Sequence, residues 1–471
     1  MQTAIDETTR QQDTAFFGHP RGLGWLSFTE VWERFSYYGM QTLLVFYMVH
    51  QLLLPGHVEH IIGFGPFRAA VESVYGPLSP QALGSVIFGL YAGLVWVTPI
   101  LGGFVADRLL SRTLTITIGA VLMVIGHFLM AFDQSFLIAL TCLLIGVGCF
   151  KGNLASQVSG LYAAGDPRAA GAFQIYYLGI QAAVIVTPLV CGTLGEAFGW
   201  HWGFGAAGVG MVIGLCLYLR ARRWLPPEPP RRSAGGAASA PMSRTDLRNV
   251  AILIGLLPVL ALVQITASQQ GNAYMIWGER NLDLTAFGLK VPVTWLATLD
   301  AMGSSSGILL SLLFWRWWAR RRAEPDEISK IAMGGVLQVL APLVLVGAAL
   351  SVAASGHRAS LGWAVLFELI MNLGWANIGP VGLALYARLA PKGANSTLCG
   401  VFYLQVFLGN MLAGWLGSKL DLMSGANFWL LHAALGGVAA LTLLLARAWI
   451  SRTLAVEAPT AVADVAPAVA G

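Results

Sequence analysis

Six ionisable residues stand inside otherwise apolar stretches, and their types and spacing suit the binding and release of protons. They are Glu30, Glu33 and Arg34 in FTEVWERFSYYGM, Lys151 in GCFKGN, Asp300 in WLATLDAMGSS and Glu368 in VLFELIMNLGW. A charge inside a membrane span costs about 3 kcal/mol or more, so such residues normally face a cavity or a partner. Four acids and two bases leave an excess of negative charge. At least one carboxylate is therefore expected to bind and release a proton as its surroundings change.

One face of the first apolar stretch holds several of these groups together with other polar side chains. At helical spacing this face carries Glu30, Arg34, Tyr37, Tyr38 and Gln41, with Glu33 at its edge. If Arg34 or Lys151 pairs with a substrate instead of Glu33, that carboxylate prefers its proton, which is a minimal proton-coupling device. The alternatives are a static ion-pair network that only holds helices together, and tyrosines that only pack.

The composition of the chain excludes a soluble enzyme. Of its 471 residues, 56% are hydrophobic and 11% are charged, and the mean hydropathy is +0.68. Soluble proteins contain about 25% charged residues, and a helix needs about 20 mostly apolar residues to cross a bilayer. Such runs predict twelve spans over residues 23–54, 82–106, 113–132, 135–162, 171–194, 201–220, 248–277, 293–318, 329–354, 360–388, 397–418 and 427–450.

A basic, Pro-rich segment separates the spans into two sets of six. The segment Arg220–Arg248 reads RARRWLPPEPPRRSAGGAASAPMSRTDLR, which is typical of a solvated linker. We therefore predict an all-α membrane protein with an N-terminal tail over 1–22, six-helix bundles over 23–220 and 248–450, a linker over 221–247 and a disordered tail over 451–471. Two bundles around a midplane cavity that opens to alternating sides are the expected architecture.

Basic residues indicate the side of the membrane on which the termini lie. Most of the 28 Lys and Arg fall at span ends that share a side with the N-terminal tail, the linker and the C-terminal tail. The positive-inside rule then places both termini in the cytoplasm. Residues 1–22 are polar and lack the apolar core of a cleavable signal. We therefore expect a multi-pass protein of the bacterial inner membrane whose first span serves as its own signal.

Other classes of function lack a matching sequence feature. The five cysteines form no CxxC or CxxH pair, and the sequence contains no HExxH, GxSxG or P-loop motif. We expect no enzyme activity, no metal and no organic cofactor, and the basic residues indicate topology rather than a nucleic-acid partner. A channel or a signalling receptor fits less well, because the sequence has no re-entrant filter, no rings of like charge and no large cytoplasmic domain.

Several of these segments resemble one known family. Glu30-x-x-Glu33-Arg34 followed by Phe-Ser-Tyr-Tyr-Gly resembles the ExxER signature of the proton-dependent oligopeptide transporter (POT/PTR) family, a branch of the major facilitator superfamily. GGFVADRLLSR (Gly102–Arg112) is similar to the superfamily's loop motif, and GCFKGN is similar to the family's fourth span. The stretch Phe173–Met211 is similar to its fifth and sixth spans. The resemblance covers nearly the whole chain and is strongest in the first half.

The resemblance implies a major facilitator fold and the import of di- or tripeptides with protons by alternating access. It implies proton coupling by Glu30, Glu33, Arg34, Lys151 and Glu368. It also implies that Glu368 faces the amino end of the substrate or joins a cytoplasmic gate with Lys151, and that Asp107 and Arg108, together with Arg112, latch neighbouring helix ends. The partners would be a small peptide, protons and membrane lipid, and the working unit a monomer. The alternatives are a facilitator for a different solute and a proton antiporter.

The chain departs from the family at positions where substrate binding is implied. Gln41 and Gln269 stand where many members carry an Arg and a Glu that pair, and paired amides could satisfy each other. Trp96 replaces a common Tyr, and Gln181 and Asp300 each replace a common Asn. The linker is too short and polar for the extra helix pair that bacterial members often carry. The predicted substrate-binding set is Arg34, Tyr37, Tyr38, Gln41, Trp96, Lys151, Gln181, Gln269, Gln270, Asp300 and Glu368.

These departures change the charge of the predicted site. With one cation fewer and one acid more, the site would bind an ammonium group well and a free carboxylate less firmly. We therefore expect ligands whose length or charge differs from those of ordinary di- and tripeptides.

Overall fold

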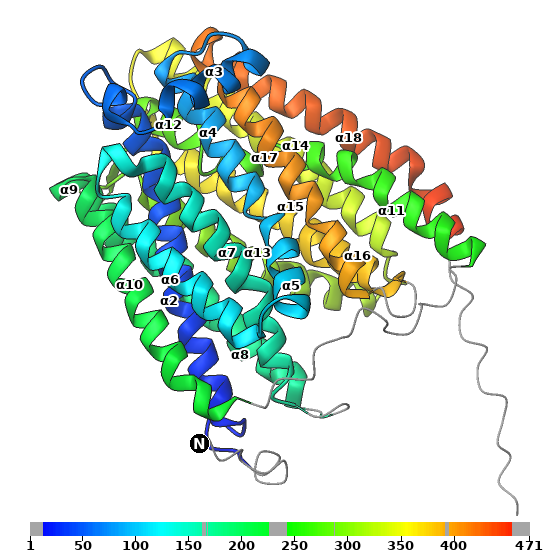
Figure 1. The fold of residues 1–471 in the computed structure, drawn as a ribbon. Helices are drawn as coiled ribbons and strands as arrows, with labels where there is room; N and C mark the ends of the chain where they lie inside the picture. Colours follow the sequence, from blue (N-terminus) through cyan, green and yellow to red (C-terminus); the bar gives the residue numbers. More distant parts are fainter. Residues whose placement is uncertain are drawn as a thin grey trace, which may run out of the picture.

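The computed structural model of the chain describes residues 13–162, 166, 168–225, 243–286, 288–390 and 395–454. Long helices that run alongside one another make up nearly all of it (Figure 1). Most of the predicted tails over 1–22 and 451–471 and of the linker over 221–247 lies outside the described residues, at 1–12, 455–471 and 226–242. Residues 451–454 correct the predicted start of the disordered tail, because they continue the last helix of the chain. Because one crossing needs about 20 residues, the stretch 225–243 between the flanking helical segments has no room for an extra helix pair.

The first half is built from nine α-helices within the described residues. In chain order they are α2 (Arg21–Tyr47), α3 (Phe64–Tyr75), α4 (Pro80–Leu94), α5 (Thr98–Arg108), α6 (Arg112–Leu129), α7 (Phe136–Ser159), α8 (Arg168–Thr187), α9 (Thr193–Phe198) and α10 (Trp200–Ala221). The π-helical segments η1 (Met48–Leu52) and η4 (Pro188–Gly192) follow α2 and α8. The 3-10 turns are η2 (Val58–His60), η3 (Asp133–Ser135) and η5 (Arg222–Trp224). Apolar run length does not predict α3, which is too short to span a membrane.

The second half is also helical, with short strands in its connections. Its helices are α11 (Arg244–Val263), α12 (Ala273–Asn281), α13 (Trp295–Ala319), α14 (Glu327–Ser355), α15 (Leu361–Arg388), α16 (Asn395–Phe402), α17 (Leu404–Gly417) and α18 (Gly425–Leu454), with 3-10 turns η6 (Ala267–Gln269) and η7 (Leu420–Leu422). Strand β1 (Leu282–Asp283) pairs in parallel with β4 (Ala359–Ser360), and β2 (Thr285–Ala286) pairs antiparallel with β3 (Leu289–Lys290). The all-α prediction therefore holds for the spans, whereas it missed these two-residue strands.

Capping residues determine where several helices begin. Ser79 accepts a hydrogen bond from the backbone N–H of Ala82 and precedes Pro80, which occupies the start of α4. Ser243 and Asp246 form a capping box at the start of α11. Such side chains satisfy backbone N–H groups that have no partner inside the helix. These caps explain why the two helices begin close to the predicted starts of the second and seventh spans.

Eleven helical segments of the described residues are long and apolar enough to cross a membrane. The first predicted span corresponds to α2, which has 27 residues but contains Glu30, Glu33 and Arg34. The predicted class, a helical multi-pass membrane protein, is confirmed. Of the twelve predicted spans, only the one at α2 is not among these eleven segments, because the charged residues of α2 lower its hydropathy.

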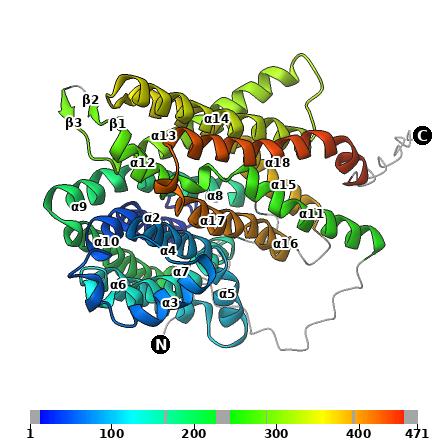
Figure 2. The same cartoon turned by 90° about the horizontal axis from the view of Figure 1, so that it is seen from above.

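The two halves of the chain lie side by side. Seen from above, α2, α4, α6, α7 and α10 gather on one side, and α13, α14, α15 and α18 gather on the other (Figure 2). Between the halves, α4 packs against α17 and α8 packs against α13. We call the end that holds Arg21, Ala221 and Arg244 the terminal end, and the opposite end, with α3 and α12, the loop end (Figure 1).

Three of the predicted spans are interrupted rather than continuous. The second changes from α4 to α5 around Trp96, and the eleventh changes from α16 to α17 at Tyr403. The seventh is broken between α11 and α12, where Gln269 and Gln270 lie. Broken helices persist at membrane depth only where protein or a water-filled cavity satisfies the freed backbone groups. Because three of these four residues were predicted site residues, the breaks indicate where the polar site lies.

Close packing joins the halves between α4 and α17. A Cβ added to Gly89 would lie 2.6 Å from the Cα of Gly414, so this approach requires glycine. Nearby, Gln81 Nε2 donates a hydrogen bond to the carbonyl of Gly417 at 3.1 Å. A second contact lies at the start of α13, where the carboxylate of Glu196 accepts hydrogen bonds from the Thr294 N–H at 2.9 Å and the Thr294 hydroxyl at 2.6 Å.

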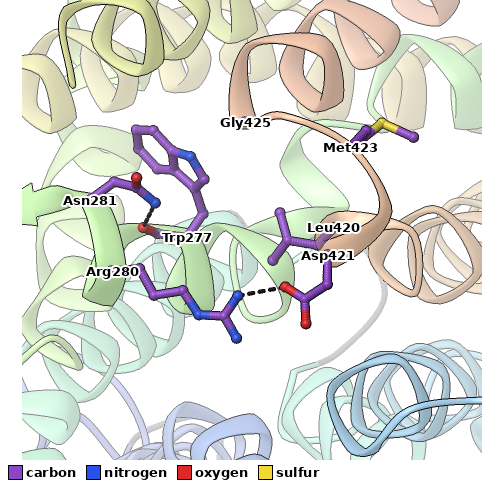
Figure 3. A pocket seen from close by; sticks show the side chains of 7 residues that line it. All are labelled: Trp277, Arg280, Asn281, Leu420, Asp421, Met423 and Gly425. Atoms are coloured by element: carbon purple, nitrogen blue, oxygen red, sulfur yellow. Dashed lines mark hydrogen bonds and ion pairs between the residues drawn. The ribbon is translucent and has the colours of Figure 1, made fainter. Parts of the chain in front are cut away.

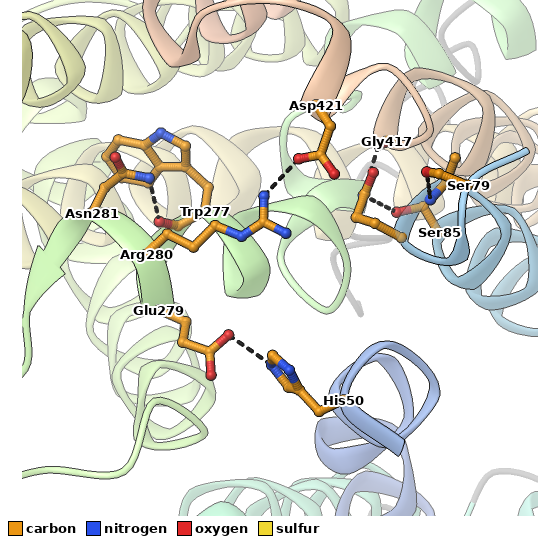
Figure 4. A network of polar contacts seen from close by, with 11 residues as sticks. His50, Ser79, Ser85, Trp277, Glu279, Arg280, Asn281, Gly417 and Asp421 are labelled. Carbon is orange, nitrogen blue, oxygen red and sulfur yellow. Dashed lines mark hydrogen bonds and ion pairs between the residues drawn. The ribbon is translucent and has the colours of Figure 1, made fainter. Parts of the chain in front are cut away.

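Further polar contacts lie at the loop end. His50 Nε2 of the first half lies 2.8 Å from Glu279 Oε2 of the second half (Figure 4). Within the second half, Arg280 Nη1 lies 2.6 Å from Asp421 Oδ1. The Arg280–Asp421 pair borders a cavity of about 270 Å³ that Trp277 also lines (Figure 3). None of the residues that line this cavity belongs to the predicted site. Hydrogen bonds therefore connect the two halves at the loop end.

Candidate functional site

Arg34 is buried between two carboxylates of its own helix, and we call these three residues the Arg34 cluster. Arg34 Nε lies 3.1 Å from Glu30 Oε1 and 2.5 Å from Glu33 Oε2, and all three side chains are at most 5% exposed. Glu30 reaches Arg34 from one helical turn away, whereas Glu33 approaches from the adjacent position. A guanidinium has several N–H donors in a fixed fork. Among the described residues, Nη2 has no hydrogen-bond acceptor, so Arg34 retains a donor for a ligand.

Two tyrosines follow Arg34 on α2. The guanidinium carbon of Arg34 lies 5.4 Å from the ring centre of Tyr37, and Tyr37 meets Tyr38 edge to face with ring centres 5.1 Å apart. Tyr37 is buried in the main hydrophobic core, whereas Tyr38 is only partly buried. The ring of Tyr37 therefore packs against a buried cation. Tyr38 is the tyrosine that keeps an accessible surface with which a ligand can make contact.

Lys151 of α7 rests on an aromatic stack that crosses between the halves. Its Nζ lies 3.8 Å from the ring centre of Trp96, at the break between α4 and α5. Trp96 stacks on Tyr403 of the second half, with ring centres 5.1 Å apart and planes 17° apart. Lys151 also interacts electrostatically with the Arg34 cluster. The gate pairing of Lys151 with Glu368 that the resemblance implied is not formed, because Lys151 contacts Trp96 and Glu368 is bound to amides.

The second half holds two acids bound to two amides, and we call these four residues the acid–amide cluster. Gln270 Nε2 donates to Asp300 Oδ1 at 2.6 Å and to Glu368 Oε2 at 2.8 Å. Asn372 Nδ2 lies 2.9 Å from the same Asp300 oxygen and 3.2 Å from the same Glu368 oxygen. Glu368 is 1% exposed, and its Oε1 has no hydrogen-bond partner among the described residues. This carboxyl group therefore has an oxygen available for a proton or a ligand.

Gln269 points away from this cluster, which corrects its predicted role. Its Nε2 donates to the carbonyl of Ala413 at 3.0 Å and lies 3.0 Å from His432 Nε2, and its side chain is completely buried. The break between α11 and α12 turns Gln269 toward α17 and α18, and turns the next residue, Gln270, toward α13 and α15. The predicted amide pair between Gln41 and Gln269 does not form, because the amide of Gln269 is bound within the second half.

The remaining predicted residues occupy different places. Gln181 of α8 donates to the hydroxyl of Ser305 of α13 at 2.9 Å, which joins the two halves near the acid–amide cluster. Gln41 is partly buried on α2, beyond the two tyrosines. Asp107 Oδ1 lies 3.2 Å from Arg112 Nη2 and connects α5 to α6. Arg108 does not reach a neighbouring helix end as predicted, because its guanidinium lies over Phe104 of its own helix.

Three residues with roles in this geometry were not singled out from the sequence: Asn372, Tyr403 and Glu196. Asn372 stands four residues after Glu368, a spacing that places both on one helix face, so that signal was available. Tyr403 lies at a helix break that apolar run length does not reveal. Glu196 lies at the end of a span, and nothing near it in sequence indicates its partner Thr294.

The charges of the two halves differ in kind. The first half presents two acids and two bases at the site, whereas the acid–amide cluster presents two acids without a base. In the described part of the chain, no group of three or more His, Cys, Asp or Glu is arranged to hold a metal ion. The arrangement suits a ligand that carries both charges, with its anionic end near Arg34 and its cationic end near Glu368.

Comparisons with known proteins identify the family. The model of the POT family matches residues 113–242 and 237–430, which is more than half of the chain. The chain belongs to the POT family. The membership of this family that the sequence predicted is thereby confirmed.

Curated relatives of this family member match along most of its length. The peptide transporter YePEPT of Yersinia enterocolitica is 27% identical over 491 residues, which cover 89% of this chain and 91% of that protein. A di-/tripeptide transporter of Lactococcus lactis is 26% identical over 510 residues, which cover 94% of this chain and 98% of that protein. The alignments therefore include both halves.

Solved structures establish the fold of this family member. A crystal structure of the peptide transporter POT in complex with sulfate superposes with a TM-score of 0.78 at 24% identity, and covers 96% of this chain and 99% of the other. A POT family transporter in complex with 5-aminolevulinic acid superposes with a TM-score of 0.76 at 21% identity, and covers 94% and 100%. The chain has the major facilitator fold of these transporters.

Proposed function

We propose that this POT family member is a symporter that imports short peptides or peptide-like solutes together with protons by alternating access. The observation that carries the proposal is Arg34, buried between Glu30 and Glu33 with an Nη2 that has no acceptor among the described residues. A ligand carboxylate that bound this nitrogen would weaken the contact between Arg34 and Glu33. Without that contact, the buried carboxyl of Glu33 favours its protonated form.

The same contact explains why ligand and proton would move in one direction. Protonation of Glu33 frees Arg34 to bind the ligand carboxylate, and departure of the ligand returns Arg34 to Glu33 and expels the proton. Each event requires the other, because either partner alone would leave a buried charge without a counter-charge, at a cost of about 3–5 kcal/mol. Proton and ligand therefore bind on one side and leave on the other, which is symport.

Short peptides fit the distribution of charge in the site. A peptide carries an ammonium group and a carboxylate, and the site offers Arg34 and Lys151 in one half and Glu368 with Asp300 in the other. Relatives aligned over most of the chain are named peptide or di-/tripeptide transporters. Gln41 and Asp300 lower the positive charge relative to the common family pattern, so we expect cationic or carboxylate-capped ligands to compete better than dialanine.

The proposed orientation places both termini in the cytoplasm of a bacterium and the loop end outside the inner membrane. The hydrogen bonds between the halves at the loop end support a state closed to the outside, in which ligand would leave toward the terminal end. Each chain contains a complete set of predicted site residues, so we propose that a monomer transports, with lipid as its surroundings and the proton as its coupling ion.

Uptake of labelled dialanine into liposomes tests the proposal. An inward proton gradient should make the unmodified protein accumulate dialanine, whereas Glu33→Gln should exchange dialanine across the membrane without accumulating it. The matched control is Glu324→Gln, which removes an exposed carboxylate at the terminal end and should accumulate like the unmodified protein. Equal uptake by the unmodified protein with and without the gradient would contradict proton coupling.

A panel of other solutes addresses the alternative function. If dialanine does not accumulate but another solute does under the same gradient, the substrate class is wrong and the coupling device stands. Accumulation driven by the opposite gradient would instead identify a proton antiporter. Gln41, Gln181 and Asp300 are the positions that would then explain the change of substrate or coupling.

A further inference from the structure

Asp300 and Glu368 are held next to each other by the same two amides. One Asp300 oxygen and one Glu368 oxygen each lie within 2.6–3.2 Å of both Gln270 Nε2 and Asn372 Nδ2. Because both oxygens contact Gln270 Nε2, at 2.6 and 2.8 Å, the separation between them is at most these two distances together, which makes the carboxyl groups neighbours. The carboxyl groups come from α13 and α15, so the packing of these two helices places them side by side.

Within the described part of the chain, the groups that face this acid pair bring no positive charge. Tyr274 of α12 faces Glu368, and Tyr38 of α2 faces Asp300. Arg316 of α13 and Asp283 of β1 are exposed. The other charged side chains on the packed elements contact different partners: Lys330 with Glu324, Arg388 with Glu327, Arg280 with Asp421, Glu279 with His50, Arg168 with Asp166, and Glu196 with Thr294.

Two buried carboxyl groups side by side cannot both be charged at an acceptable cost when no cation faces them. Like charges close together repel strongly at low dielectric, and such a pair retains one proton. Gln270 and Asn372 donate to Asp300 Oδ1 and Glu368 Oε2 and stabilise the one remaining charge. Glu368 Oε1 is buried without an aligned hydrogen-bond partner among the described residues, and the phenol of Tyr274 faces this carboxyl group, so Oε1 offers an oxygen on which the proton can reside.

We propose that Asp300 and Glu368 share one proton and form a proton-binding site in the second half, separate from the Arg34 cluster. When the ammonium group of a ligand approaches this pair, the proton leaves to water and both carboxylates accept hydrogen bonds from the ammonium. Its use in transport rests on the proposed function, whereas the shared proton itself does not require any ligand to be transported.

Infrared spectroscopy of the purified full-length protein in detergent, without ligand, tests the shared proton. A protonated carboxyl has its own C=O absorption, and the pH at which this absorption is half lost can be measured. The double variant Asp300→Asn/Glu368→Gln supplies the blank, because the difference from it contains only this pair. In the unmodified protein we expect absorption equivalent to one carboxyl that persists well above the pH at which exposed carboxyls ionise, about 4.

The single variants show whether the two groups are coupled. Asp300→Asn leaves Glu368, and Glu368→Gln leaves Asp300, each without a charged neighbour. Each remaining carboxyl should lose its absorption at a pH lower by about one unit or more than the pair does, because the repulsion is gone. No absorption in the unmodified protein would overturn the proposal. It would also be overturned if one variant removed the absorption and the other left its midpoint unchanged.

A further variant keeps the test decisive if the variants that remove an acid misfold. Gln270→Met keeps both acids and removes a donor that stabilises the charged form, so it should move the midpoint upward. An unchanged midpoint in Gln270→Met would also count against the proposal. Failure of dialanine uptake in liposomes would leave these spectra unaffected, so the shared proton and the proposed function can fail separately.

Discussion

The two buried clusters hold their acids in different ways. In the Arg34 cluster, Glu30 and Glu33 face a cation that is always charged. In the acid–amide cluster, Asp300 and Glu368 face neutral groups, the amides of Gln270 and Asn372 and two tyrosines. Hydrogen bonds from neutral donors are about half as strong as those from charged ones. The first cluster can therefore remain ionised without a ligand, whereas the second requires a proton or a cationic ligand.

The largest expected effect comes from removing the cation of the first cluster. Arg34→Met would leave Glu30 and Glu33 buried without the cation that contacts both of them, so we expect a loss of about 3–5 kcal/mol in stability and no dialanine transport. Thermal unfolding in detergent measures the first quantity. The control is Arg108→Met, whose guanidinium lies exposed over Phe104 and should change stability by less than about 0.5 kcal/mol. Unchanged unfolding of Arg34→Met would remove the distinction between the clusters.

Removing an acid from the acid–amide cluster should not lower the stability of the protein, in contrast to removing Arg34. Glu368→Gln relieves the crowding of two acids, so its unfolding temperature should stay equal or rise, while dialanine accumulation falls because the ligand ammonium loses a charged partner. The same unfolding assay, run beside Arg34→Met, measures the contrast. Glu72→Gln, which changes a carboxylate paired with Arg68 outside both clusters, is the control. Strong destabilisation by Glu368→Gln would show that this acid has an unseen cationic partner.

A smaller effect is expected at the stack between the clusters. Trp96→Leu removes the ring on which Lys151 rests and which stacks on Tyr403. A desolvated cation–π contact is worth about 2 kcal/mol and an exposed one about 0.5–1 kcal/mol, so the dialanine concentration for half-maximal uptake should rise about tenfold. For Trp96→Phe, which retains a ring, this concentration should rise less. Equal effects of the two substitutions would mean that the ring face contributes nothing.

The smallest effect concerns Asp326, an acid that precedes the membrane-spanning helix α14 and lies outside both clusters. Burial opposes its ionisation, but hydrogen bonds from Ser329 and Ser451 outweigh burial and lower the pKa of Asp326. A lowered pKa in the folded state adds stability above the unfolded value, near 4, and this stability is lost as pH falls through the folded value. Asp326→Asn should therefore unfold at a lower temperature than the unmodified protein at neutral pH, with a difference that shrinks below about pH 4. A constant difference across this range would contradict the lowered pKa.

Much of the fold could be predicted because apolar run length and span number are properties of local sequence. Apolar runs predict twelve spans, of which eleven correspond to helical segments long and apolar enough to cross a membrane and the first corresponds to α2. The breaks in the second, seventh and eleventh spans could not be predicted in this way, because each is stabilised by partners distant in sequence. Trp96 and Tyr403, for example, meet only when the two halves are assembled.

The sequence predicted which residues belong to the candidate site better than it predicted which of them contact each other. Charge in an apolar span identifies Glu33, Arg34 and Glu368 whatever the fold. Which residue each one contacts depends on how its helix is rotated about its axis. The adjacent residues Gln269 and Gln270 point in different directions, so Gln269 contacts His432 whereas Gln270 contacts the acids. Asp300 was predicted as an extra acid for the ligand, and its geometry makes it equally a partner of Glu368.

The most direct test of the proposed proton coupling is the pH inside liposomes that contain the protein and a pH-sensitive dye, measured as dialanine is added outside without an initial proton gradient. The account predicts that the lumen acidifies as dialanine enters, and that Glu33→Gln abolishes the acidification while dialanine still exchanges. Entry of dialanine with no change in luminal pH in the unmodified protein would contradict it.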